Sequence, residues 1–194
     1  MGRPNSDEWN IQERRKGSLP ISLNNLIICC GLKTEQNYFD SVAKIIKQNY
    51  PQQTGINFDI EPDPVDPQKM VTHLSSRKNL SSYQHVWIVF DKDDFGKDNF
   101  DNAVKSVEER NKKKSGTKYH ALWSNECIEL WFLLHFEYMN ADIKRTRYFE
   151  KLSSHLGNHY EKKDKEIAIK MTLMGGDLKI AIKNANKLLT LHDG

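Results

Sequence analysis

The sequence has no hydrophobic run approaching the roughly 20 residues that a membrane-spanning helix needs. Residues 1–16 are polar and charged, without the apolar stretch of a secretory signal peptide. Cysteine is scarce: the three cysteines form no CxxC spacing, and their odd number argues against a disulfide framework. We therefore expect a protein of the reducing cytoplasm with no membrane partner, and the sequence does not indicate an oligomeric state.

Strong charge of one sign is also missing. The net charge is only +3, too small to identify a nucleic-acid partner. The basic residues do cluster, at Arg14–Lys16, Lys112–Lys114 and Lys162–Lys163, although such runs commonly just solvate a surface. Of these runs, Lys112, Lys113 and Lys114 are the candidate for contact with a phosphate backbone. The 10% aromatic content is too high for a disordered chain, and 194 residues are enough for one domain with a small appendage.

Strands and helices alternate along most of the chain. The pattern predicts strands at 25–30, 56–60, 86–90 and 119–123, and helices at 35–49, 68–80, 99–112 and from Cys127 onward. Such alternation is typical of an α/β fold with a small parallel sheet flanked by helices. The predicted organisation is a flexible leader over 1–20, an α/β domain over 21–140, and a helical extension over 141–194 that packs on it.

The most informative segment is an apolar strand that ends in acid. Val86–Phe90 reads as a strand buried on both faces, and Asp91-Lys92-Asp93-Asp94 follows it. Ligands of open parallel sheets bind at the carboxyl ends of the strands, and side chains two apart on an extended chain point the same way. Asp91 and Asp93 could thus converge on a hard cation such as Mg²⁺. The alternative is that Asp93 and Asp94 only cap a turn.

Two other strand ends carry polar residues. After the first strand, Gly31 allows close backbone approach, and Glu35 begins the next helix, for which Thr34 is a plausible N-cap. After the fourth strand, Ser124 or Asn125 is expected to cap a helix that is apolar except for Glu129. A buried carboxylate there should face the site or a cation, because burying it unpaired is costly. His135 lies further along this helix, where a lone histidine is more often part of the core than a catalyst.

Three segments together resemble the RloB-like family. They are 27–39 (IICCGLKTEQNYF), 89–95 (VFDKDDF), and the set Ser124-Asn125, Ile128-Glu129, Trp131 and His135-Phe136. The resemblance implies a Toprim-type fold with a metal-dependent phosphotransfer site. It also implies a place in bacterial restriction and anti-phage loci, including AbiL-related abortive infection, often beside an AAA-type ATPase, with RNA cleavage as the suggested activity.

One position departs from the family pattern, which has Glu before Gly where this chain has Cys30 before Gly31. Thiolate is a soft ligand, poorly matched to magnesium. Three alternatives stay open: a weakened or inactive homologue that binds nucleic acid or a partner, a site in which Glu35 and Glu129 take over, or a catalytic thiol. A phosphotransferase with Asp91 as nucleophile ranks lower, because such folds generally place their Asp-x-Asp after the first strand.

From this resemblance and these strand ends we expect a Mg²⁺- or Mn²⁺-dependent nuclease that favours RNA over DNA, with tRNA as one candidate; the sequence alone does not decide between RNA and DNA. The metal ligands expected are Asp91, Asp93 and Glu35. The wider catalytic set expected is Glu35, Asp91, Asp93, Glu129, Cys30 and His135. The residues expected to contact substrate are Gly31, Lys33, Lys92, Ser124, Asn125, Lys112, Lys113 and Lys114.

Overall fold

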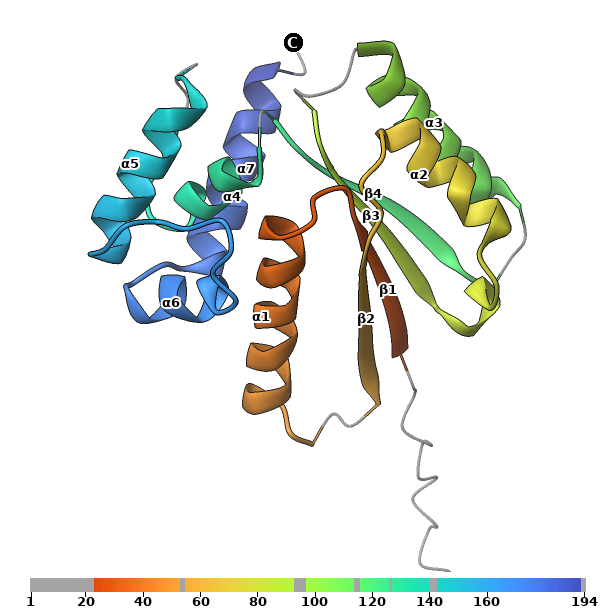
Figure 1. The fold of residues 1–194 in the computed structure, drawn as a ribbon, viewed down its shortest axis with the longest axis horizontal. Coiled ribbons are helices and arrows are strands. Elements are labelled where there is room, and N and C mark those ends of the chain that lie inside the picture. The colour runs from red at the N-terminus through yellow and green to blue at the C-terminus, as the bar shows by residue number, and fades with distance from the viewer. Residues whose placement is uncertain are drawn as a thin grey trace, which may run out of the picture.

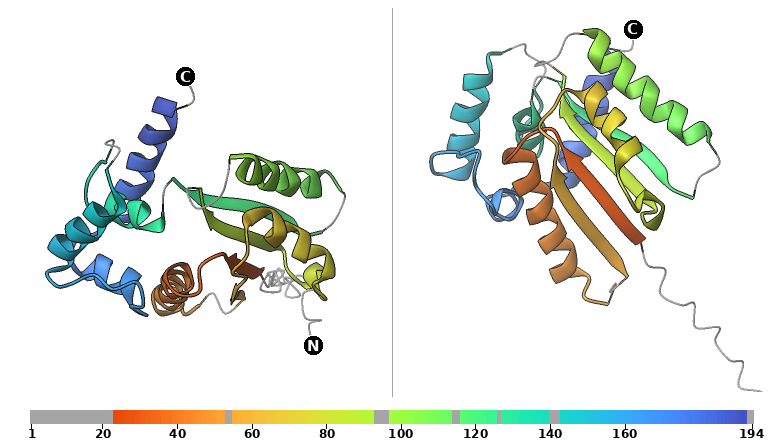
Figure 2. Two further views of the ribbon diagram at one scale, coloured as in Figure 1. Left: turned by 45° about the horizontal axis from the view of Figure 1, so that its top comes forward. Right: turned by 45° about the vertical axis from the view of Figure 1, so that its right-hand side comes forward.

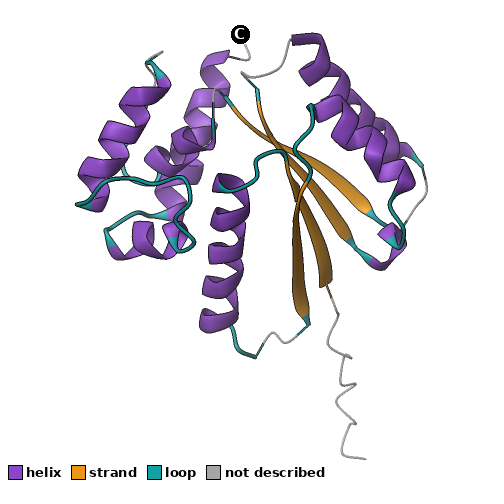
Figure 3. Ribbon diagram, viewed as in Figure 1, coloured by secondary structure: helices purple, strands orange, loops and turns teal. Residues whose placement is uncertain are grey.

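The structure is a computed structural model that describes residues 23–52, 55–92, 97–113, 116–125, 127–139 and 143–192. Its elements, in chain order, are β1 (Leu23–Cys29), α1 (Thr34–Asn49), β2 (Ile56–Pro62), α2 (Pro67–His73), the 3₁₀ turns η2 (Leu74–Ser76) and η3 (Leu80–Ser82), β3 (His85–Asp91), α3 (Lys97–Lys112), β4 (Lys118–Ser124), α4 (Ile128–Leu134), α5 (Arg145–Leu156), α6 (Ile167–Leu173) and α7 (Leu178–His192). Figures 1 and 3 show strands and helices alternating up to α4, followed by helices alone.

The four strands form one parallel sheet in the order β2-β1-β3-β4. The register pairs Cys29 with Val89 and Asp91 with Ser124, so the carboxyl ends of β1, β3 and β4 lie at one edge. We call this the carboxyl edge of the sheet. The predicted α/β fold with a small parallel sheet, flanking helices and a helical C-terminal part is therefore confirmed.

Different helices cover the two faces of the sheet (Figure 2). On one face, Ile28, Ile88 and Phe90 pack against α2 and α3 in a core that includes Met70 and Ala103. On the other face, the smaller cluster of Ile27, Cys29 and Val89 meets Phe39 of α1. The alternation follows the two-residue period of a strand, in which neighbouring side chains point to opposite faces.

A third core lies among the helices. Residues of α4, α5, α6 and α7 pack with Tyr38 of α1 around Phe132, Leu133 and Leu152, which are fully buried. The link between α7 and α4 includes polar contacts, since Asn184 donates to the carbonyl oxygen of Leu134 at 2.9 Å. The helical extension therefore packs on α4 and α1 at one side of the sheet. In the described part of the chain, no helix is long and apolar enough to cross a membrane.

Three local predictions were wrong. The helix expected over 68–80 ends at His73, and Asn79 takes a left-handed conformation (φ 63°) before η3, which a continuous helix does not allow. Thr34 is the first residue of α1 and not its cap. Ser124 and Asn125 do not cap α4, because that helix begins later and Cys127 is its N-cap residue.

Candidate active site at the carboxyl edge

Asp91 is the central residue of the carboxyl edge. It ends β3, is partly buried, and has the strand parity of Trp87 and Val89, so it lies on the face that α1 covers. Its Oδ1 accepts a hydrogen bond of 3.0 Å from Oγ of Ser124, the paired residue of β4. The serine expected to contact substrate therefore orients the aspartate.

The electrostatic environment of Asp91 disfavours its charge. The pKa of Asp91 is raised to about 7, first by burial and then by the negative charges of Glu35 and Glu129, while the Ser124 hydrogen bond and Arg145 act in the opposite direction. A carboxyl group with this pKa, close to other carboxylates, is stabilised by any cation that joins it. The sequence prediction that Glu35 and Glu129 belong with Asp91 agrees with this electrostatic coupling.

Glu35 reaches the edge because Gly31 has no side chain. Glu35 stands in the first turn of α1 and is only 7% exposed. A Cβ at position 31 would lie 1.8 Å from Oε2 of Glu35, well inside the closest approach of real atoms. The glycine of the β1–α1 turn thus makes room for the carboxylate of Glu35, a role different from direct contact with substrate.

Glu129 lies on the other side of the edge, in the first turn of α4, with 1% of its surface exposed. The hydroxyl of Tyr160 donates to its Oε1 at 3.0 Å, and Nζ of Lys162 lies 3.7 Å from the same oxygen. The negative charge of Glu129 adds to burial in raising the pKa of Tyr160, so Tyr160 stays a protonated donor. The expectation of a cation beside Glu129 agrees with the position of Lys162.

The three cysteines lie near this edge, and none of their thiols is arranged as a reactive thiolate. Sγ of Cys30 donates to the carbonyl oxygen of Val65 at 3.1 Å, and Cys30 packs with the α2–α3 core, on the face opposite Asp91. Burial raises the pKa of the Cys29 and Cys127 thiols well above the usual range, so both stay neutral.

Other predicted site residues lie away from the acids. Nδ1 of His135 donates to the carbonyl oxygen of Trp131 at 2.9 Å, and burial lowers the pKa of His135, as fits a neutral core histidine. Lys92 lies on the α3 face, with its Nζ 5.1 Å from the ring centroid of Phe100 and 5.5 Å from that of Trp123.

The predicted phosphate-binding loop is not brought to the acids. Lys112 ends α3 and Lys113 follows it, immediately before β4 begins, so both lie at the amino edge of the sheet. A strand of seven residues separates the two edges by about 20 Å. Lys114 and Asp93 lie outside the described residues. Asn125 is exposed just beyond β4, and Lys33 is exposed at the start of α1.

Sequence reasoning missed Tyr160 and Arg145, which the fold brings to the edge from the helical extension. Neither has a local pattern that marks it, because each meets the acids only through tertiary packing. Lys162 had a weak signal, since the Lys162–Lys163 pair stands in a polar, loop-like context.

The donor set at this edge fits a hard divalent cation. The described acids and Ser124 offer oxygen atoms, the thiol of Cys30 is directed to Val65, and burial keeps the thiols of Cys29 and Cys127 neutral. Among the residues that the structure describes, no three His, Cys, Asp or Glu side chains already stand close enough to hold a metal ion. Asp93, which sequence spacing places beside Asp91, is outside that set.

The fold and this edge define an α/β protein whose parallel sheet ends in buried, mutually repelling carboxylates. The chain belongs to the RloB-like family: the sequence model of RloB-like proteins matches residues 25–194. No curated protein matches the sequence.

Proposed function

We propose that this protein is a metal-dependent nuclease that cleaves RNA, with tRNA as one candidate substrate, and acts as the effector of a bacterial phage-defence system. The observation that carries the proposal is the partly buried Asp91, whose pKa rises to about 7 beside Glu35 and Glu129. A fold gains no stability from such repulsion, so a cation and an anionic substrate are the natural partners. The defence setting, and an AAA-type ATPase partner, come from the family resemblance.

Asp91, with Glu35 and Asp93, would hold Mg²⁺ or Mn²⁺, which when bound would orient a phosphodiester and stabilise the charge that develops as it breaks. Ser124 keeps Asp91 in one orientation through its hydrogen bond. Because Gly31 has no Cβ, the Glu35 carboxylate can occupy its position at the edge. The attacking group is either water or a ribose hydroxyl.

Glu129 is the candidate for moving a proton. It is buried, and the Tyr160 hydroxyl and the Lys162 ammonium both contact its Oε1. The hydrogen bond from Tyr160 holds the carboxylate in one orientation, as a general base requires, and Lys162 adds an ion pair. Glu129 and Glu35 would then compensate for the glutamate that is absent at Cys30.

A second candidate function is supported by the position of Cys30. Its thiol is hydrogen-bonded to Val65 and contributes no acid to the edge. The protein would then be a non-catalytic subunit that binds nucleic acid or a partner and retains the fold.

The test is cleavage of labelled tRNA, single-stranded RNA and DNA by the purified chain in Mg²⁺, Mn²⁺ or EDTA. Wild type is compared with Asp91→Ala, with Cys30→Glu, and with Asp101→Ala, which removes an exposed carboxylate of α3 as a matched control. We expect wild type and Asp101→Ala to cut RNA in metal, and Asp91→Ala to be inactive.

Undiminished cutting in EDTA would refute the metal-dependent mechanism. Activity that appears only in Cys30→Glu would establish the second function, because the fold would then be intact and only the acid missing. Preferential cutting of DNA would retain the chemistry and change the substrate.

A further inference from the structure

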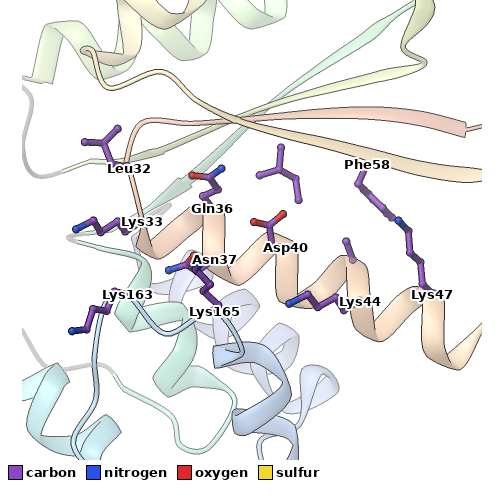
Figure 4. A pocket seen from close by; sticks show the side chains of 12 residues that line it. Leu32, Lys33, Gln36, Asn37, Asp40, Lys44, Lys47, Phe58, Lys163 and Lys165 are labelled. Carbon is purple, nitrogen blue, oxygen red and sulfur yellow. The ribbon is translucent and has the colours of Figure 1, made fainter.

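A lysine-lined cleft runs along α1 and begins next to the acids of the carboxyl edge. It has a volume of about 580 Å³ and lies between α1, β2 and the segment that precedes α6 (Figure 4). Its cationic residues are Lys33, Lys44, Lys47, Lys163 and Lys165, all of them exposed. We call it the lysine groove.

The groove carries uncompensated positive charge. Its single acidic lining residue is Asp40, against five lysines. Lys163 pairs with Glu161 at 3.4 Å, but the other four lysines form no ion pair with any residue that the structure describes. Clustered cations in a concave surface raise the local concentration of anions, because the low-dielectric walls focus the field.

The shape and floor of the groove limit what it can bind. Lys33 and Lys47 mark its two ends (Figure 4), and 14 residues of helix separate them by about 21 Å. The floor between them includes the apolar side chains of Phe58 and Ile60 from β2. A cationic groove with an aromatic ring suits a single strand, whose phosphates meet the cations and whose bases stack on the ring. Its volume of about 580 Å³ is that of a small-ligand pocket, too small to enclose a double helix.

The groove adjoins the acids at one end. Lys33 is two residues from Gly31 and from Glu35 in the β1–α1 turn. On the opposite wall, Lys163 follows Lys162, whose ammonium lies 3.7 Å from Glu129. A strand lying in the groove would therefore extend directly to the carboxyl edge.

We propose that the lysine groove binds the phosphodiester backbone of single-stranded RNA and guides the strand to the carboxyl edge. The proposal rests on the proposed function and adds the path of its substrate. It also replaces Lys112 and Lys113, which lie at the amino edge, as the main contact with the backbone.

The test is the affinity of the full chain for a labelled oligouridine of about 12 nucleotides, long enough to fill the groove. Fluorescence anisotropy is measured in EDTA, so that binding is recorded without cleavage, across salt from about 50 to 200 mM. The variant is the double change Lys44→Glu with Lys47→Glu. The matched control is Lys112→Glu with Lys113→Glu, which also reverses two exposed lysines at the end of a helix.

We expect the groove variant to lose about tenfold or more in affinity at low salt, and its salt slope to flatten by about 1.4, because each phosphate contact to a single strand contributes about 0.7. The control should stay close to wild type. An equal loss of affinity in both variants would mean that only the net charge of the protein matters. No loss of affinity in the groove variant would mean that the groove does not bind the strand. Either result overturns the proposal. The Lys44→Gln, Lys47→Gln pair, with unchanged thermal unfolding, guards against misfolding and should show a smaller loss in the same direction.

Three further probes test the ligand class. Duplex RNA and polyglutamate should compete weakly, and equal competition by either would overturn assignment to a single nucleic-acid strand. Single-stranded DNA of matching sequence shows whether the sugar matters. If the groove variant loses binding but wild type never cleaves RNA, the groove proposal is supported and the nuclease proposal is refuted. If wild type cleaves RNA and the groove variant binds normally, the nuclease proposal is supported and the groove proposal is refuted.

Discussion

Replacing Asp91 by Asn should stabilise the metal-free protein while abolishing cleavage. Asn has nearly the same shape and no charge, and its Oδ1 can still accept the hydrogen bond from Ser124. Its amide would donate toward the region of the Glu35 and Glu129 charges that raise the pKa of Asp91. The substitution thus removes a repulsion and retains the contact.

The magnitude follows from the pKa. A rise from the ordinary value near 3.9 to about 7 corresponds to about 4 kcal/mol of destabilisation once Asp91 is ionised in the folded state. Asp91 is only partly buried, so we expect about 2–3 kcal/mol. For a protein of this size, that is an increase of about 4–12 °C in melting temperature.

The size of this effect depends on pH, while its sign does not. Because the folded-state pKa is raised, the folded protein binds a proton that the unfolded chain has released, so stability falls as pH rises from about 4 to about 7 and is then constant. The advantage of Asp91→Asn over wild type should therefore be small near pH 4, grow through this window, and stay at its maximum above pH 7.

The assay is thermal unfolding in EDTA across this pH range, with Asp101→Asn as a control for loss of an exposed carboxylate. Adding Mg²⁺ at pH 8 should raise the melting temperature of wild type more than that of Asp91→Asn, because a ligand that binds only the folded state stabilises it. An Asp91→Asn protein that is less stable than wild type at pH 8, or equally more stable at every pH, would refute the reasoning.

Two further substitutions test the other acids. Gly31→Ala should displace the Glu35 carboxylate, because the Oε2 atom would lie 1.8 Å from the new Cβ. We expect lower metal-dependent cleavage and a smaller stabilisation by Mg²⁺, with less than about 1 kcal/mol lost from the free energy of unfolding measured in urea. An unchanged response to Mg²⁺ would contradict this. Tyr160→Phe should lower the free energy of unfolding by about 1.5–3 kcal/mol, because it removes a hydrogen-bond donor from the buried Glu129. The control Tyr138→Phe should change it by almost nothing, since the Tyr138 hydroxyl has no hydrogen-bond partner among the described residues. Equal losses in the two variants would argue against the Glu129 contact.

The sequence predicted the sheet well because its signals are local. Val86–Phe90 is apolar without interruption, which is typical of a strand covered on both faces, and the structure has β3 there in the middle of a parallel sheet. Placing Asp91, Ser124 and Gly31 at one edge then follows from parallel topology alone. The α2 region was predicted less well, because the left-handed Asn79 interrupts a segment whose apolar spacing resembles a helix.

The contacts between the edge and the helical extension could not be predicted in this way. Tyr160 is 31 residues from Glu129 along the chain, and nothing in its neighbours shows that the two meet. The lysine groove is similar, since Lys163 and Lys165 join Lys33 and Lys44 only after α6 has packed on α1. Lys112 and Lys113 are the reverse case: they belong to a conspicuous charge run in the sequence, but they lie at the amino edge because α3 returns the chain to the start of β4.

The direction of one side chain changes how Cys30 is understood. Read from the sequence, a cysteine at this position suggests either a lost metal ligand or a thiol aimed at the substrate. In the structure, Cys30 has the parity of Ile28 and its thiol donates to Val65, while Asp91 lies on the face of Val89. The thiol is therefore directed away from the face on which Asp91 lies. In the proposed mechanism, the acids that act with Asp91 are Glu35, which Gly31 admits, and Glu129, which the helical extension contacts through Tyr160 and Lys162.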